Sequence, residues 1–276
     1  MHAGVAHGHA VTGLIAMDAW QTVASLASGG LVGFVLGLIG GGGSILATPL
    51  LLYVVGVAQP HVAIGTGALA VSANAYANFI SHALRRNVCW RCAIVFALVG
   101  TLGALAGSSL GKAIDGQRLL LMFGLVMVIV GVAMLRRRRE SSPGHEVTTL
   151  RNCLRAGALA LFAGAASGFF GIGGGFLIVP ALMLATGMSM GNAVGSSLLA
   201  VGTFGLATAL NYAVSGLVDW GIAGLFILGG VAGGVLGTRL SLRWAQRRTL
   251  LTRIFAVLVF AVAIYILYRS AGTLLA

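Results

Sequence analysis

The chain contains few charged residues, and this scarcity is the first guide to its class. Charged residues make up 8% of its 276 positions, hydrophobic residues make up 58%, and the mean hydropathy is +1.01. A soluble domain carries roughly 25% charged residues. The composition therefore argues against an ordinary soluble domain and predicts an integral membrane protein whose main partner is the lipid bilayer.

Acidic side chains are scarcer still, with five Asp and Glu against 17 Lys and Arg. They lie outside the apolar segments or at their edges, at Asp18, Asp115, Glu140, Glu146 and Asp219. Proton pumps and sodium-coupled carriers generally place a carboxylate within the membrane, so we expect no such carrier group here. No acid stands near His61 or His82 to complete a serine–histidine–acid set, and we therefore expect no enzymatic activity.

The chain has only three cysteines, which predicts no disulfide framework. Cys89 and Cys92 form a lone Cys-x-x-Cys motif without the second ligand pair that a structural zinc site needs. We expect no metal and no cofactor. The basic residues are not interleaved with aromatic residues as a single-strand stacking surface requires, so we expect no nucleic-acid partner.

Long apolar segments recur from end to end, and most approach the length of about 20 residues needed to cross the hydrocarbon core. We identify ten, at 21–39, 44–57, 62–84, 90–111, 119–135, 153–171, 175–188, 192–215, 219–238 and 250–268. Segments 44–57 and 175–188 cover only about 21 Å as helices, short of a full crossing. We predict an all-α polytopic membrane protein.

The net charge of +12 reflects the loops, which fix an orientation. With the N-terminus outside, all but three of the 17 Lys and Arg residues fall on the inner side. Because positive charge favours the cytoplasmic side, we predict extracytoplasmic N- and C-termini in a bacterial plasma (inner) membrane. The first apolar stretch has no Lys or Arg before it, so we expect no cleaved signal peptide.

The sequence repeats internally at an offset of 130 to 131 residues. Trp90 aligns with Trp220, and loop 85–91, which carries three Arg, aligns with loop 215–219, which carries only Asp219. Five segments per half and this swap of loop charge predict two inverted repeats. The predicted divisions are an extracytoplasmic tail 1–20, a first transmembrane repeat 21–139, a cytoplasmic linker 140–152 and a second transmembrane repeat 153–276. We interpret the glycines of 100–111 and 229–237 as helix-packing positions.

Two glycine runs occupy corresponding positions in the repeats, Gly40–Gly43 before Pro49 and Gly171–Gly175 before Pro180. Glycine costs about 1 kcal/mol relative to alanine in a helix, so each run predicts a helix break. A helix that restarts after a break presents unpaired N–H groups and the positive end of its dipole. In an inverted repeat, two such ends could converge as a site for an anion.

Neutral donors on the following segments would complete this site. Asn74 and Asn78 share a helix face because they are four residues apart. An alternative is that Ser and Thr bond their own backbone and that Asn joins one helix to another. The predicted substrate-binding set is Gly40, Gly41, Gly42, Gly43, Ser44, Thr66, Asn74, Asn78, Gly171, Gly173, Gly174, Gly175, Ser196 and Ser197.

With these two motifs, the chain resembles the TauE/SafE family of sulfite exporters and anion permeases over about residues 20–270. The resemblance implies transport of a small inorganic or organosulfur anion. We expect a permease that works by alternating access at a central site. A passive anion channel and a non-transporting membrane scaffold or accessory subunit remain alternatives, and a scaffold would have no central polar cavity and would give the two breaks no shared focus. The choice of anion, the direction, the coupling ion and the oligomeric state stay open.

Overall fold

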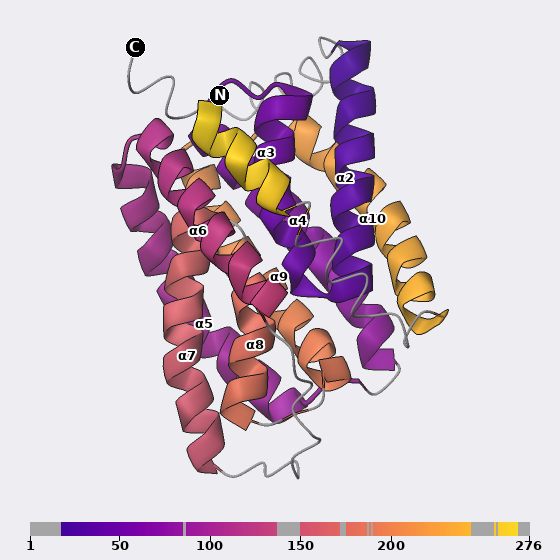
Figure 1. Ribbon diagram of the computed structural model, residues 1–276, viewed down its shortest axis with the longest axis vertical. Helices are drawn as coiled ribbons and strands as arrows, with labels where there is room; N and C mark the ends of the chain where they lie inside the picture. The colour runs from indigo at the N-terminus through magenta and orange to yellow at the C-terminus, as the bar shows by residue number, and fades with distance from the viewer. Residues whose placement is uncertain are drawn as a thin grey trace, which may run out of the picture.

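The structure, a computed structural model, describes residues 18–84, 87–136, 150–171, 175–186, 188, 190–243, 257 and 259–269. The described residues form helices and no strands, as predicted for an all-α polytopic membrane protein. Figure 1 shows α2 (Ala19–Ile39), η1 (Gly41–Leu46), α3 (Ala47–Leu50), η2 (Leu51–Val55), α4 (Pro60–Leu84), α5 (Trp90–Ala113), α6 (Gly116–Arg136), α7 (Leu150–Phe170), α8 (Gly175–Thr186), α9 (Met190–Val214), α10 (Trp220–Arg243) and a C-terminal helix, Val259–Arg269.

Within the described residues, four helices are long and apolar enough to cross a membrane, at Ala19–Leu38, Trp90–Ala113, Gly191–Val214 and Trp220–Leu240. The two predicted short segments are short helical runs, Gly41–Val55 and α8, and at 1.5 Å per residue they cover about 22 and 18 Å. The outer faces carry exposed leucines, among them Leu98, Leu102 and Leu228. Such faces suit contact with lipid rather than water.

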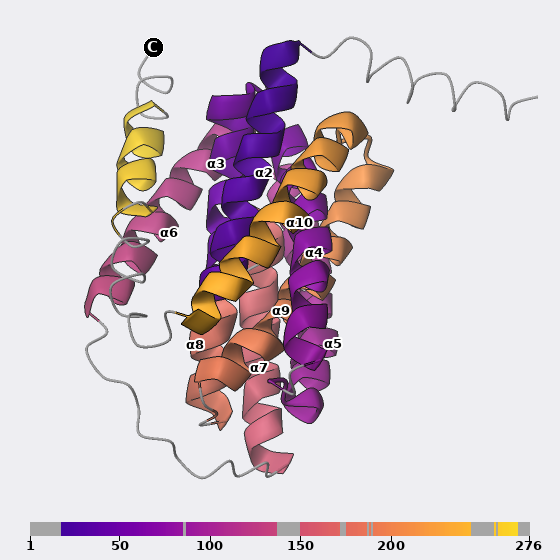
Figure 2. The same cartoon turned by 90° about the vertical axis from the view of Figure 1, so that its right-hand side faces the viewer.

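The long helices are paired between the two halves of the chain. α2 packs most extensively against α10, and α5 packs most extensively against α7. Under the repeat offset, α2 corresponds to α7 and α10 corresponds to α5, so the two pairs are equivalent. In Figure 2, α2 approaches the middle of the molecule from the top and α7 approaches it from the bottom. α4 and α9, which also correspond to each other, pack together between the two pairs.

Glycines bring the backbones within each pair into direct contact. A Cβ added to Gly33 on α2 would overlap the carbonyl of Gly230 on α10, and one added to Gly164 on α7 would overlap the carbonyl of Gly100 on α5. Small residues allow this approach, and close packing is a main source of stability between helices in lipid. The predicted packing role of the glycines in 100–111 and 229–237 is confirmed.

α6 and the C-terminal helix form a further equivalent pair beside the bundle (Figure 2). Gly124 and Gly131 on α6 lie under Leu267 and Phe260. Tyr265 on the C-terminal helix makes an edge-to-face contact with Tyr53 of η2, with ring centroids 5.1 Å apart. This contact connects the outer pair to the helical run that follows the first glycine break.

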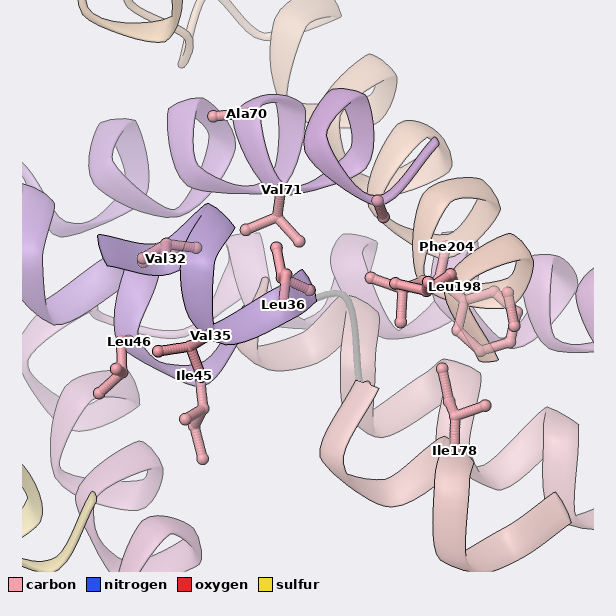
Figure 3. Close-up of a cluster of buried hydrophobic side chains, with 14 of the residues drawn as sticks. Val32, Val35, Leu36, Ile45, Leu46, Ala70, Val71, Ile178, Leu198 and Phe204 are labelled. Carbon is pink, nitrogen blue, oxygen red and sulfur yellow. The ribbon is translucent and has the colours of Figure 1, made fainter. Parts of the chain in front are cut away.

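The buried core surrounds the middle of the bundle. Figure 3 shows Val32 and Leu36 of α2 near Val71 of α4, Ile45 of η1 beyond them, and Ile178 of α8 near Leu198 of α9. All of these side chains are buried. The middle of the bundle is therefore largely apolar, with buried polar side chains such as Ser44, Thr66 and Asn74 among the described residues, and electrostatic interactions there are stronger than in water.

Candidate anion site at the glycine crossing

The two long helices that approach the centre both stop at a glycine in the left-handed region. Gly40 ends α2 with φ 82°, and Gly171 follows α7 with φ 66°. The Gly40 N–H donates to the Leu36 carbonyl over 2.9 Å, and the Gly171 N–H donates to the Gly168 carbonyl over 3.2 Å. Side chains other than glycine rarely adopt such φ values. Each break therefore depends on glycine for its backbone direction.

The two breaks meet. A Cβ on Gly41 would overlap the backbone of Gly175, and a Cβ on Gly175 would overlap the backbone of Gly41. Across the same region, Val194 covers Gly40 and Ile64 covers Gly171, and Ile64 and Val194 correspond under the offset of 130. The two breaks therefore share a focus, which is one of the two features that a scaffold would lack.

We call this contact of Gly41 with Gly175 the glycine crossing. There, η1 begins at Gly41 and α8 begins at Gly175. The first N–H groups of a helix have no intrahelical acceptor, and the Gly43 N–H makes only a long bond of 3.4 Å to the Gly40 carbonyl. Two helix N-termini in an apolar setting can hold negative charge without a cation. Because Gly41 and Gly175 touch, an anion cannot lie directly between these two residues unless the crossing parts.

Two equivalent residues of the predicted set, Thr66 and Ser196, each accept a hydrogen bond from a loop N–H in the other half of the chain. The Thr66 hydroxyl oxygen accepts the backbone N–H of Asp219 over 2.9 Å. The Ser196 hydroxyl oxygen accepts the backbone N–H of Cys89 over 3.0 Å. Both side chains are fully buried. Each hydroxyl keeps a hydrogen to donate, but its position is fixed by a structural bond.

The other two serines of the set bond their own helices. Ser44 donates to the Gly41 carbonyl over 2.8 Å, and Ser197 donates to the Val194 carbonyl over 2.8 Å. This is the self-bonding alternative expected for hydroxyls. Ser44 is part of η1 at the crossing, and Ser197 lies three residues after Val194, which covers Gly40. Both hydroxyls therefore stabilise the backbone of segments that border the crossing. Gly173 and Gly174 lie outside the described residues.

Asn78 joins α4 to α10. Its Nδ2 donates to the Asn74 carbonyl over 2.9 Å, and its Oδ1 accepts the Thr238 hydroxyl over 3.1 Å. Asn74 differs, because neither amide atom has a hydrogen-bond partner among the described residues although the side chain is fully buried. Leaving such a group unpaired costs about 1–3 kcal/mol. The predicted amide pair thus contains one packing residue and one unsatisfied residue.

Comparison with known proteins then decides the family. The model of the family described as "Sulfite exporter TauE/SafE" matches residues 25–266. The chain belongs to this family. It is 63% identical over 94% of its length to the whole of a probable membrane transporter protein of Xylella fastidiosa strain 9a5c. It is 26% identical to the probable membrane transporter protein YunE of Bacillus subtilis, covering 85% of this chain and 94% of that protein. No solved structure matches the chain.

The TauE/SafE assignment makes the protein a membrane transporter. The glycine motifs that carried the resemblance occupy the crossing of Gly41 and Gly175. The part of the chain that the structure describes brings no three His, Cys, Asp or Glu residues together as metal ligands.

In the sequence, Lys112 counted only among the loop charges that orient the chain. In the structure of this TauE/SafE protein, Lys112 lies in a cluster of polar side chains. Its Nζ donates to the Asn211 carbonyl, to Asn211 Oδ1 and to the Ser215 hydroxyl over 2.8–2.9 Å. The Asn211 amide in turn donates to the Ser108 hydroxyl over 2.7 Å. These bonds join the ends of α5 and α9. Asn211 lies in the last turn of α9 and Ser215 lies in the turn that follows it, and their spacing of four residues was the available signal.

Proposed function

We propose that the protein transports a small anion by alternating access at the glycine crossing. The observation that supports this proposal is the contact of Gly41 with Gly175, which brings the N-termini of η1 and α8 together. Sulfite, or a related sulfur oxyanion or organosulfonate, supplies oxygens that accept backbone N–H groups. The family description supports sulfur chemistry. All five acidic residues lie outside the apolar segments or at their edges, where they would not repel an anion within the membrane.

The swapped pairing suggests which parts move. α2 and α10 are held together by backbone contacts at glycine, as are α5 and α7. We propose that these two pairs rock as units about α4 and α9, and that the crossing opens to one side at a time. Each moving unit would contain helices from both repeats. The repeat boundaries proposed above therefore describe inverted halves of the sequence and not the moving bodies.

The proposed setting is a bacterial plasma (inner) membrane with both termini on the extracytoplasmic side. The loop charges support this orientation through the positive-inside rule. In an inside-negative membrane an anion is driven outward by about 2.3 kcal/mol per charge per 100 mV. An electrogenic uniporter would therefore export its substrate without a carboxylate to carry protons.

Flux in proteoliposomes tests the proposal. Sulfite and a permanently ionised sulfonate are followed while voltage and the pH gradient are set independently. Electrogenic transport by alternating access predicts saturable flux of both anions, driven by voltage alone. Flux that rises without saturation would favour the anion channel, and absence of flux for every anion would favour an accessory role. A requirement for a pH gradient that His61→Ala or His82→Ala removes would show that the protein carries its own proton group.

A further inference from the structure

One pair of equivalent positions breaks the internal symmetry. Asn74 on α4 and Phe204 on α9 correspond under the offset of 130 residues. Each faces a glycine of the adjoining helix: Asn74 lies against Gly230 of α10, and Phe204 lies against Gly100 of α5. Gly230 and Gly100 correspond under the same offset. The two halves therefore build the same junction and place an amide in one copy and an aromatic ring in the other.

The α9–α5 junction is filled by the aromatic ring of Phe204. Phe204 is fully buried and stacks on Phe96 of α5, with centroids 6.2 Å apart and an interplanar angle of 23°. Phe204 also lies beside Leu198 in the apolar cluster (Figure 3). No polar side chain is needed to satisfy this junction. Phe204 itself provides packing between α5 and α9 and offers no donor to a ligand; one turn further along α9, the buried Thr208 hydroxyl has no hydrogen-bond partner among the described residues.

The amide copy is not satisfied by the protein. Asn74 is fully buried, and the described residues offer no hydrogen-bond partner to its Nδ2 or its Oδ1. A purely structural asparagine would be paired, as Asn78 is through the Asn74 carbonyl and the Thr238 hydroxyl. The Asn78 bond to the Asn74 carbonyl also fixes this stretch of α4. An unpaired amide held in place in this way is suited to a ligand that brings its own acceptor.

We propose that the substrate path is one-sided: it runs along the α4–α10 junction, where Asn74 Nδ2 donates to a substrate oxygen, and the α9–α5 junction is closed by Phe204. Asn78 is a positioning residue for this donor. This inference rests on the proposed anion transport for the identity of the acceptor, but the location of the path can be tested without it.

Accessibility tests the location. The native cysteines at 89, 92 and 153 are first replaced, and Asn74→Cys and Phe204→Cys are made in separate chains. A small charged methanethiosulfonate reagent is then applied to the full protein in proteoliposomes. A one-sided path predicts that position 74 is modified and position 204 is not. Modification at both positions, or at neither, overturns the inference.

Transport kinetics test the donor. Asn74→Leu is expected to raise the KM for sulfite or sulfonate about tenfold or more, since a bond to a charged oxygen is lost. Phe204→Leu should leave KM within about twofold. An unchanged KM in Asn74→Leu overturns the donor role, and recovery of monodisperse protein shows whether each variant has folded. If no anion is carried but position 74 alone is modified, the proposed anion transport fails and the one-sided path stands.

Discussion

Ser72 donates its hydroxyl hydrogen to the carbonyl of Gly202 over 2.7 Å, and these two residues occupy the same position in the two halves of the chain. The bond joins α4 to α9 where equivalent helices cross, so it lies close to the axis that relates the repeats. Gly202 also leaves room for the ring of Tyr76, which a Cβ would overlap. The contact between the halves therefore uses the same position twice, once as a donor and once as an acceptor.

Alanine at the glycine crossing should sharply reduce transport. In Gly41→Ala or Gly175→Ala, the added methyl group would enter the opposing backbone, and overpacking of this kind costs roughly 1–3 kcal/mol. We expect flux per folded molecule to fall about tenfold or more. Gly224→Ala is the matched control, because nothing lies within 4 Å of its added Cβ. Normal flux in both crossing variants would place the substrate elsewhere.

The α2–α10 pair offers a sharp contrast between neighbouring glycines. A Cβ on Gly33 would overlap the Gly230 backbone, whereas a Cβ on Gly30 would sit 3.6 Å from the Gly229 carbonyl, an ordinary contact. Gly33→Ala should lower the melting temperature and the yield in detergent, with a loss of about 1–3 kcal/mol. Gly30→Ala should be neutral or stabilising, since alanine favours the helix by up to about 1 kcal/mol. Equal melting temperatures for the two variants would contradict the observed packing.

The caps made by Thr66 and Ser196 should matter for stability more than for substrate affinity. Thr66→Val removes the acceptor for the Asp219 N–H, and Ser196→Ala removes the acceptor for the Cys89 N–H. Each change should cost about 0.5–1.5 kcal/mol, because a part-buried hydrogen bond that caps a backbone N–H is lost. Thr203→Val is the control, since its hydroxyl donates to the Ala200 carbonyl of its own helix and caps no loop N–H among the described residues. A large rise in KM with unchanged thermal stability would instead assign the hydroxyls to the substrate.

The proposed orientation can be measured with single cysteines in a background that lacks native cysteine. A cysteine at Ser215, an exposed turn position before α10, should react with an impermeant external reagent on intact cells. A cysteine at Gly144, in the linker outside the described residues, should react only after the membrane is permeabilised. The reverse pattern would invert the topology.

Hydropathy was sufficient to predict the helical segments, because lipid requires long apolar helices and the spacing of apolar runs is direct evidence of them. The breaks were also predictable, since glycine runs interrupt helices. The pairing of α2 with α10 was not. Small residues such as Gly33 and Gly230 mark faces that allow close approach, but one sequence does not say which face meets which.

The chemistry of individual site residues was harder to predict than their location. Four hydroxyl residues of the predicted set lie at the crossing or on the helices α4 and α9 beside it: Ser44, Thr66, Ser196 and Ser197. The sequence does not indicate whether such a hydroxyl will bond a ligand, its own helix or a neighbouring loop. Asn74 and Asn78 show the same limit. They share a helix face, and only the glycine and threonine positions on α10 decide that one amide is paired and the other is not.

The exchange of partners between α2–α10 and α5–α7 has a consequence for biogenesis. α2 leaves the insertion machinery early, but its main partner, α10, is among the last helices to be synthesised. Until then, the glycine face of α2 has only lipid or provisional neighbours. Contacts between residues so distant along the chain form late and slowly. A ribosome stalled before Trp220 would therefore carry a chain in which α2 is inserted but not yet packed against α10, and such a chain is a natural target for membrane chaperones and quality-control proteases.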